Sequence, residues 1–204
     1  MPVLGPRRTK PTGPLLGPVT VAIREVRWED FHPLVENYFS YYDELTDEPG
    51  LGLILFAEKP SLADEAAWFL GLYRSQLAGD QVALVAEVDG RPVGLVQVRR
   101  GLPHPETGHV GDLGISIHRD HRGKGLGTRL LREALRRCRG RFEVVNLRVF
   151  ADNERAKALY RKMGFVTVGR VPKAVHRGGR YFDEEIMHLD LGRAPPEGDG
   201  PSAP

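Results

Sequence analysis

The sequence predicts a domain of the α/β (α+β) class, with a mixed central sheet of about seven strands flanked by about four helices. Short β-branched runs alternate with longer segments whose apolar residues recur at helical spacing. Asp89-Gly90 separates two of the apolar runs and is a strong hairpin signal. A glycine-rich turn at residues 122–128 joins a strand-like run to an amphipathic segment. The resulting order, β-α-α-β-β-β-α-β-α-β-β, is satisfied by helices on both faces of one sheet.

The N-terminal half is predicted to begin with one strand and two helices. Residues 19–26 are apolar and β-branched, which favours a strand. Residues 30–45 carry apolar side chains at helical spacing. Ser61 begins the second helix, because Asp64 follows three residues later in a pattern close to a capping box. The stripe expected to be buried on this helix consists of Leu62, Ala66, Phe69, Leu70, Tyr73 and Leu77.

The middle of the chain is predicted to form a hairpin, a third strand and a helix. Residues 82–88 and 92–99 are the hairpin strands on either side of the Asp-Gly turn. Residues 110–117 form the next strand, which leads into the glycine-rich turn. The helix that follows is expected to bury Leu126, Leu130, Leu131, Ala134, Leu135 and Cys138.

The C-terminal part is predicted to add a strand at residues 142–150 and a helix at residues 153–163. Residues 165–171 and 181–191 then form two strands around a turn that contains adjacent glycines. The whole domain is expected to span residues 19–193.

Composition limits what lies outside this domain. Residues 1–18 and 194–204 are rich in proline and glycine and are predicted to be disordered tails, and the first has no apolar signal region. No apolar run approaches the roughly 20 residues of a membrane span, so no membrane partner is expected. A single cysteine excludes an intrachain disulfide, and no histidine spacing fits a metal site. These features favour a cytoplasmic protein without a metal.

Residues 122–128, Arg-Gly-Lys-Gly-Leu-Gly-Thr, predict an anion cradle. Glycines let backbone N–H groups approach a ligand, and a helix that begins there points its unpaired N–H groups and positive dipole end at the same spot. Phosphate or pyrophosphate fits such a site. A P-loop is excluded because Gly125 follows Lys124, and a G-x-G-x-x-G fingerprint is excluded by the alternating glycines. A tight turn with solvated cations is the simpler alternative.

A second motif lies downstream at residues 153–165, Asn-Glu-Arg-Ala-Lys-Ala-Leu-Tyr-Arg-Lys-Met-Gly-Phe. It resembles the N-x-x-A-x-x-L/F-Y-x-x-x-G-F stretch of the GCN5-related N-acetyltransferases (GNAT superfamily). Arg122, Gly125 and Gly127 match the R/Q-x-x-G-x-G/A motif of the same family. The resemblance covers residues 21–191. It implies the GNAT fold and direct transfer of an acetyl group from acetyl-CoA to a primary amine of a small molecule or a protein.

The resemblance also implies which residues bind acetyl-CoA. The glycine-rich turn would hold the pyrophosphate, and the preceding strand would pair with the pantetheine arm. An ordinary core strand is the alternative for residues 113–117. Asn153 would both cap its helix and touch the donor. The expected donor-binding residues are Ile115, Ser116, Ile117, Arg122, Gly123, Lys124, Gly125, Leu126, Gly127, Thr128 and Asn153.

Two residues are expected to carry the catalysis. By the resemblance, Tyr160 is the general acid that protonates the departing thiolate, although its place on the apolar stripe also suits a core tyrosine. Asp112 stands at about the position of the family's base and would act through water, or it is structural. His109, slightly upstream, is a weaker candidate. Lys157 is expected to be solvent-exposed.

The acceptor pocket is expected between the first two helices and the last hairpin. Acidic and aromatic side chains would suit a cationic amine. The candidates are Tyr38, Tyr41, Tyr42, Glu44, Trp68, His176, Arg177, Tyr181 and Asp183. The acceptor itself is not identified, and a homodimer is expected only because such dimers are common in the family.

Two rival interpretations remain open. A catalytically silent acyl-CoA sensor would keep the glycine-rich turn without acceptor chemistry. The helix after that turn is rich in arginine and could bind an anionic partner or the CoA 3′-phosphate, but a solvated helix face is preferred and the formal net charge of +2 does not favour nucleic acid. The arginines concerned are Arg129, Arg132, Arg136, Arg137, Arg139 and Arg141.

Overall fold

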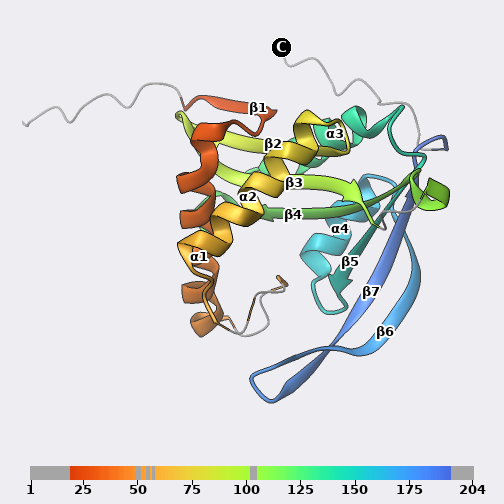
Figure 1. Ribbon diagram of the computed structural model, residues 1–204. Helices are drawn as coiled ribbons and strands as arrows, with labels where there is room; N and C mark the ends of the chain where they lie inside the picture. The colour runs from red at the N-terminus through yellow and green to blue at the C-terminus, as the bar shows by residue number, and fades with distance from the viewer. Residues whose placement is uncertain (1–18, 49–51, 54–55, 57, 102–104, 194–204) are drawn as a thin grey trace, which may run out of the picture.

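The computed structural model describes residues 19–48, 52–53, 56, 58–101 and 105–193. Within this part of the chain, one seven-stranded mixed sheet has the order β1-β2-β3-β4-β5-β7-β6 (Figure 1). The strands are β1 (Val21–Glu25), β2 (Gln81–Val88), β3 (Arg91–Arg100), β4 (Val110–Ile117), β5 (Val144–Phe150), β6 (Val166–Arg177) and β7 (Arg180–Asp190). The helices are α1 (Phe31–Asp47), α2 (Leu62–Leu77), α3 (Leu126–Cys138) and α4 (Glu154–Lys162), with single 3-10 turns η1 (Trp28–Asp30), η2 (Pro105–Thr107) and η3 (Arg119–His121).

This architecture confirms the predicted fold class and the predicted element order. The hairpin turn at Asp89 and Gly90 is present, and both residues have positive φ, as a tight turn requires. The C-terminal hairpin is longer than predicted, because β6 continues past residue 171 through a bulge to Arg177. The predicted tails, residues 1–18 and 194–204, lie outside the described residues.

The two faces of the sheet are covered differently (Figure 1). The larger core lies under α3 and α4, where α3 buries all six predicted apolar residues. The smaller core lies under α1 and α2 and includes Leu34, Phe69 and Leu72. The side chains of Arg136 and Arg137 on the outer face of α3 form ion pairs with Glu133, in agreement with a solvated helix face.

The predicted stripe of α2 is wrong for four of its six residues. Leu62, Leu70 and Leu77 are 53%, 44% and 71% exposed and Ala66 is also exposed, whereas Glu65 and Leu72 are buried. The physical reason is that the inward face of α2 does not rest wholly on a packed core. Its first turns border a cavity, described below, so a carboxylate takes a position that periodicity alone would give to an apolar residue.

Strand β4 diverges from β5 in the middle of the sheet. It pairs with β3 from Gly111 to Ile117, but it pairs with β5 only from Val110 to Asp112. Beyond Asp112 the edge of β4 that faces β5 has no strand partner in the described sheet, and its backbone groups there are open to an extended ligand. The two strands separate visibly in Figure 1. The splayed stretch ends directly before the glycine-rich turn.

Candidate active site

The glycine-rich turn presents a row of N–H groups that have no hydrogen-bond partner among the described residues. Gly123 and Gly125 have φ of 78° and 79°, a conformation that glycine adopts at little cost. Gly125 is the N-cap of α3, and the first N–H of the helix to bond along the chain is that of Arg129, to the carbonyl of Gly125. The N–H groups of residues 123–128 donate to no other described residue. Together with the helix dipole, these N–H groups have the geometry that suits an anion.

Cationic side chains surround this turn. Lys124 is exposed. Arg155, at the start of α4, places its Nη2 atom 3.5 Å from the point where a Cβ on Gly123 would lie. These charges favour a polyanion such as a pyrophosphate at the turn.

The side chain of Arg122 has another task. Its guanidinium forms a two-point ion pair with Glu44 of α1, and Arg122 Nε donates to the carbonyl oxygen of Ile117 at 2.8 Å. The side chain of Glu44 is 6% exposed. Arg122 therefore fastens the start of the turn to the end of β4 and to α1, and its guanidinium is committed to these contacts.

Asn153 caps α4 as predicted, since its Oδ1 accepts from the N–H of Ala156 at 3.0 Å. Its Nδ2 lies directly against Gly52 in the α1–α2 connection. The prediction for Lys157 is wrong: this residue is 3% exposed, and its Nζ is bound by Glu154, Glu185 and a backbone carbonyl. The reason is that the Lys157 side chain reaches the carbonyl of Ala151 and Glu185 of β7, which pair its charge where it is buried.

Tyr160 projects from α4 with its ring buried, and its hydroxyl has no partner among the described residues. The residue is 7% exposed, and its ring packs edge-on against Phe165 at 5.9 Å between centroids. The hydroxyl forms no hydrogen bond with any described residue, and it is not among the polar atoms sealed from solvent. Burial raises the pKa of Tyr160 to about 12, so the phenol is protonated at neutral pH and available as a donor.

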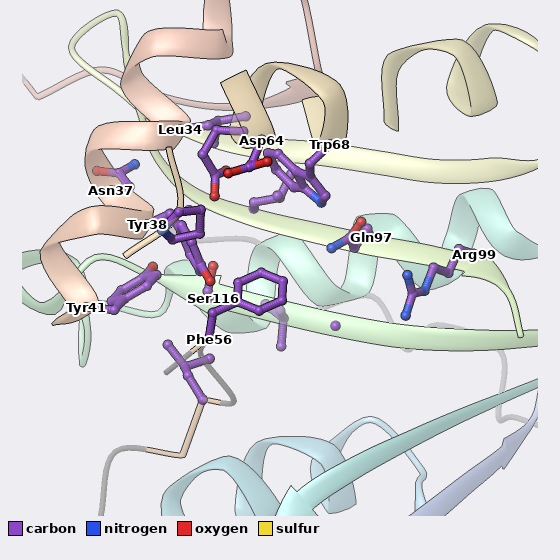
Figure 2. Close-up of a pocket in the computed structure, with 17 residues that line it drawn as sticks. Leu34, Asn37, Tyr38, Tyr41, Phe56, Asp64, Trp68, Gln97, Arg99 and Ser116 are labelled. Atoms are coloured by element: carbon purple, nitrogen blue, oxygen red, sulfur yellow. The ribbon is translucent and has the colours of Figure 1, made fainter. Parts of the chain in front are cut away.

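A cavity of about 530 Å³ lies between α1, α2, β3 and β4. Figure 2 shows Tyr38 and Tyr41 of α1, Asp64 and Trp68 of α2, and Gln97 and Arg99 of β3 around it. The splayed part of β4 contributes Gly114, Ile115 and Ser116 to the same wall. A molecule in this cavity therefore reaches the strand that leads to the glycine-rich turn.

The structure brings together only some of the predicted acceptor residues. Tyr38, Tyr41 and Trp68 line the cavity, whereas Tyr42, Glu44 and the four hairpin candidates are not among its described lining residues. In the hairpin, Asp183 pairs with Arg170, and Tyr181 stacks on His176. The lining residues that sequence reasoning missed include the charged residues Asp64, Glu65 and Arg99 and the amides Asn37 and Gln97.

Asp112 lies on the last residue pair of β4 with β5, next to the splay. It is exposed, and it faces Arg99 across the β3–β4 ladder. It is not among the described residues that line the cavity. His109 is exposed on the surface before β4. A carboxylate at Asp112 therefore needs a connecting water to act on a molecule in the cavity.

The model of the Acetyltransferase (GNAT) family matches residues 22–165, which include the splayed strand, the glycine-rich turn and the Tyr160 helix. The chain belongs to this family. The family match and the N-acetyltransferases among its relatives show that it is an acetyl-CoA-dependent N-acetyltransferase. The family assignment confirms the resemblance on which the predicted fold and activity rested.

The names of two curated relatives state which acceptors those enzymes acetylate. The L-amino acid N-acetyltransferase AaaT of Escherichia coli is 34% identical over 108 residues, which are 51% of this chain and 65% of the relative. The L-methionine sulfoximine/L-methionine sulfone acetyltransferase of Pseudomonas paraeruginosa is 26% identical over 71% of this chain and 84% of the relative. This chain is similar to both.

A solved structure supports the fold. The GNAT superfamily phosphinothricin acetyltransferase from Sinorhizobium meliloti, in complex with acetyl-CoA, superposes with a TM-score of 0.70 at 23% identity and covers 86% of this chain and 91% of its own. Among the described residues, no helix is long and apolar enough to cross a membrane, and no group of three metal-binding side chains is found.

Proposed function

We propose that this enzyme acetylates the α-amine of a free L-amino acid or of a close analogue. The names of the two curated relatives support this class of acceptor. The observation that carries the proposal is Arg99, whose guanidinium lines the cavity and forms no ion pair with a described residue. A guanidinium is the side chain best suited to bind a carboxylate. Substrate bound there lies alongside the splayed strand.

The donor is proposed to lie along the open edge of β4, with its pyrophosphate on the N–H groups of residues 123–128. The acceptor amine attacks the thioester carbon directly, and Tyr160 donates its proton to the departing thiolate. An acceptor that enters as an ammonium ion loses two protons: Asp112 takes the first through water before the attack, and the second leaves the nitrogen after the attack and returns through water to the phenolate of Tyr160. A backbone N–H at Ile115 or Ile117 would polarise the acetyl carbonyl. A two-substrate complex of this kind needs no covalent intermediate on the enzyme.

The first test is release of free thiol from acetyl-CoA with a panel of amines. The panel contains L-amino acids, L-methionine sulfone, amino acid amides, polyamines, aminoglycosides and short peptides. We expect release with amino acids and much less with the corresponding amides, which lack the carboxylate. Release only with peptides or polyamines would contradict the proposed acceptor. No release, in a sample that acetyl-CoA protects from heat, would favour a silent sensor.

The role of Arg99 is tested by Arg99→Met. Because hydrogen bonds to charged groups contribute about 1.5–3 kcal/mol, we expect KM for the amino acid to rise about 10- to 100-fold. The variant should also lose the preference for the acid over the amide. Arg91→Met is the control, because Arg91 lies on the same strand in an exposed pair with Glu36 outside the cavity. An Arg99 variant that keeps its preference for the acid would exclude this role.

The glycine-rich turn is tested by Gly125→Ala. Since an L-residue at positive φ costs about 1 kcal/mol, the variant should lose that much stability and also bind acetyl-CoA more weakly. Gly140→Ala is a closely matched control. Gly140 has the same φ of 79°, nothing lies within 4 Å of its added Cβ or that of Gly125, and it sits beyond the far end of α3. Equal losses of acetyl-CoA affinity in the two variants, measured by calorimetry, would argue against the cradle.

A further inference from the structure

Glu65 is a buried carboxylate that has no partner among the described residues. It lies near the start of α2, is 5% exposed, and lines the cavity. It forms no hydrogen bond or ion pair with any described residue. Its oxygens are not among the unpaired polar atoms sealed inside the protein, so the carboxylate opens on the cavity. A molecule that enters the cavity can therefore reach this carboxylate.

An unpaired carboxylate in such a place is costly. Burial disfavours its charged form, and it is the main reason that the pKa of Glu65 is raised, with the neighbouring charge of Asp64 adding to the effect. The start of α2 does not need this charge as a cap. Asp64 already closes a capping box with Ser61. A cationic ligand would remove the cost by giving the carboxylate a counter-charge.

The surroundings of Glu65 suit a cation. Burial is the main reason that the pKa of Tyr38 is raised, and the charge of Glu65, which lies nearby, adds to the effect. Asp64 and Trp68 come from α2 and face the cavity opposite Tyr38, and Arg99 lies beyond Gln97 on β3 (Figure 2). The cavity therefore presents acidic and aromatic side chains on its α2 side and a basic side chain on β3. Carboxylates beside aromatic faces attract ammonium groups by charge and by cation–π interaction.

We propose that Glu65 binds the ammonium group of the acceptor and selects cationic amines for this cavity. The proposal rests on the proposed function in one respect, namely that the acceptor occupies the cavity beside β4. It assigns recognition to Glu65, and proton removal stays with Asp112 and water. The acceptor enters as the ammonium ion, which is the form that amino acids have at neutral pH.

Binding is tested with simple probes in the presence of CoA, which lacks an acetyl group and so prevents turnover. The dissociation constants of n-butylammonium and n-butanol are measured by calorimetry for the wild type, Glu65→Gln and Glu36→Gln. We expect the wild type to bind the ammonium at least about tenfold more tightly than the alcohol, as one charged hydrogen bond would give. Glu65→Gln should lose this preference, and Glu36→Gln, on the exposed side of α1, should keep it.

Two outcomes would overturn the proposal: a wild type without the preference, or a Glu65→Gln variant that keeps it. Protection from heat by acetyl-CoA shows that each variant is folded. The result is independent of the acceptor panel. If amino acids are not acetylated but the preference for the ammonium depends on Glu65, the role of Glu65 is supported and the proposed class of acceptor is excluded. If amino acids are acetylated and the preference does not depend on Glu65, only this inference falls.

Discussion

Replacement of Tyr160 by phenylalanine is expected to lower kcat by about 10²-fold or more, the usual contribution of a general acid. The affinity for acetyl-CoA should stay nearly unchanged. The hydroxyl is the part of this residue that has no partner among the described residues, while the ring is packed against Phe165. The change therefore removes the proposed proton donor and leaves the packing in place. Steady-state kinetics with saturating acceptor, together with calorimetry for acetyl-CoA, measure the two quantities.

The free energy of unfolding distinguishes a loss of the proton donor from a loss of packing in the Tyr160→Phe variant. Since no hydrogen bond to a described residue is lost, the free energy of unfolding of Tyr160→Phe should equal that of the wild type or exceed it. Tyr73→Phe is the control, because the Tyr73 ring is stacked on Phe69 in α2 and does not line the cavity. A Tyr160→Phe enzyme with unchanged kcat would remove the acid role.

The pH dependence follows from the direction of the pKa shift. Burial raises the pKa of Tyr160 to about 12, so the phenol keeps its proton throughout the usual assay range. Deprotonation of Tyr160 should therefore not lower the rate as the pH rises through neutrality. Any change of rate with pH in that range is expected to come from the amine or from a carboxylate. The burial that disfavours the phenolate therefore keeps Tyr160 in its protonated form, which can donate the proton.

The parts of the fold that were predictable are those set by local chemistry. α3 buries all six of its predicted residues, because one continuous apolar face lies on the sheet. The turn at Asp89-Gly90 and the bounds of β4 follow in the same way from turn residues and alternation. The glycine-rich turn was visible because its glycines and the helix after it are adjacent in sequence.

The parts that were missed depend on contacts between distant segments. Glu44 and Arg122 are separated by 78 positions, and nothing in the local pattern of either indicates their ion pair. Glu65 and Arg99 meet the same cavity only after α2 folds across β3. Periodicity assumes that the inward face of a helix meets apolar core. Where the inward face meets a cavity instead, as on α2, that assumption assigns the wrong residues.

The ion pair between Glu44 and Arg122 leads to the second large expected effect. Removal of one partner of a buried pair leaves the other charge unpaired and costs about 3–5 kcal/mol. The side chain of Arg122 is 24% exposed, so water offsets part of this loss. We expect Glu44→Gln to lose about 3 kcal/mol, toward the low end of that range. For a protein of this size that corresponds to a fall in Tm of about 6–12 °C.

Glu36→Gln is the matched control for that variant, since it breaks a glutamate–arginine pair of the same helix whose side chains are 64% and 62% exposed. Such a surface pair contributes about 0–1 kcal/mol. Thermal unfolding of the two variants under the same conditions therefore measures what burial adds. Equal losses of stability in the two variants would show that the buried Glu44–Arg122 pair stabilises the fold no more than an exposed pair does.

The Glu44 variant should also weaken acetyl-CoA binding, because the same guanidinium holds the carbonyl of Ile117 where β4 meets the turn. A double variant, Glu44→Leu with Arg122→Met, separates the two effects. An apolar pair of similar volume often restores the stability of a broken buried ion pair. It has no donor for the carbonyl of Ile117, however, so we expect stability to recover while acetyl-CoA affinity stays low. Recovery of both would mean that the pair supports the fold alone, and loss of both would mean that the cavity left by the pair cannot be repacked.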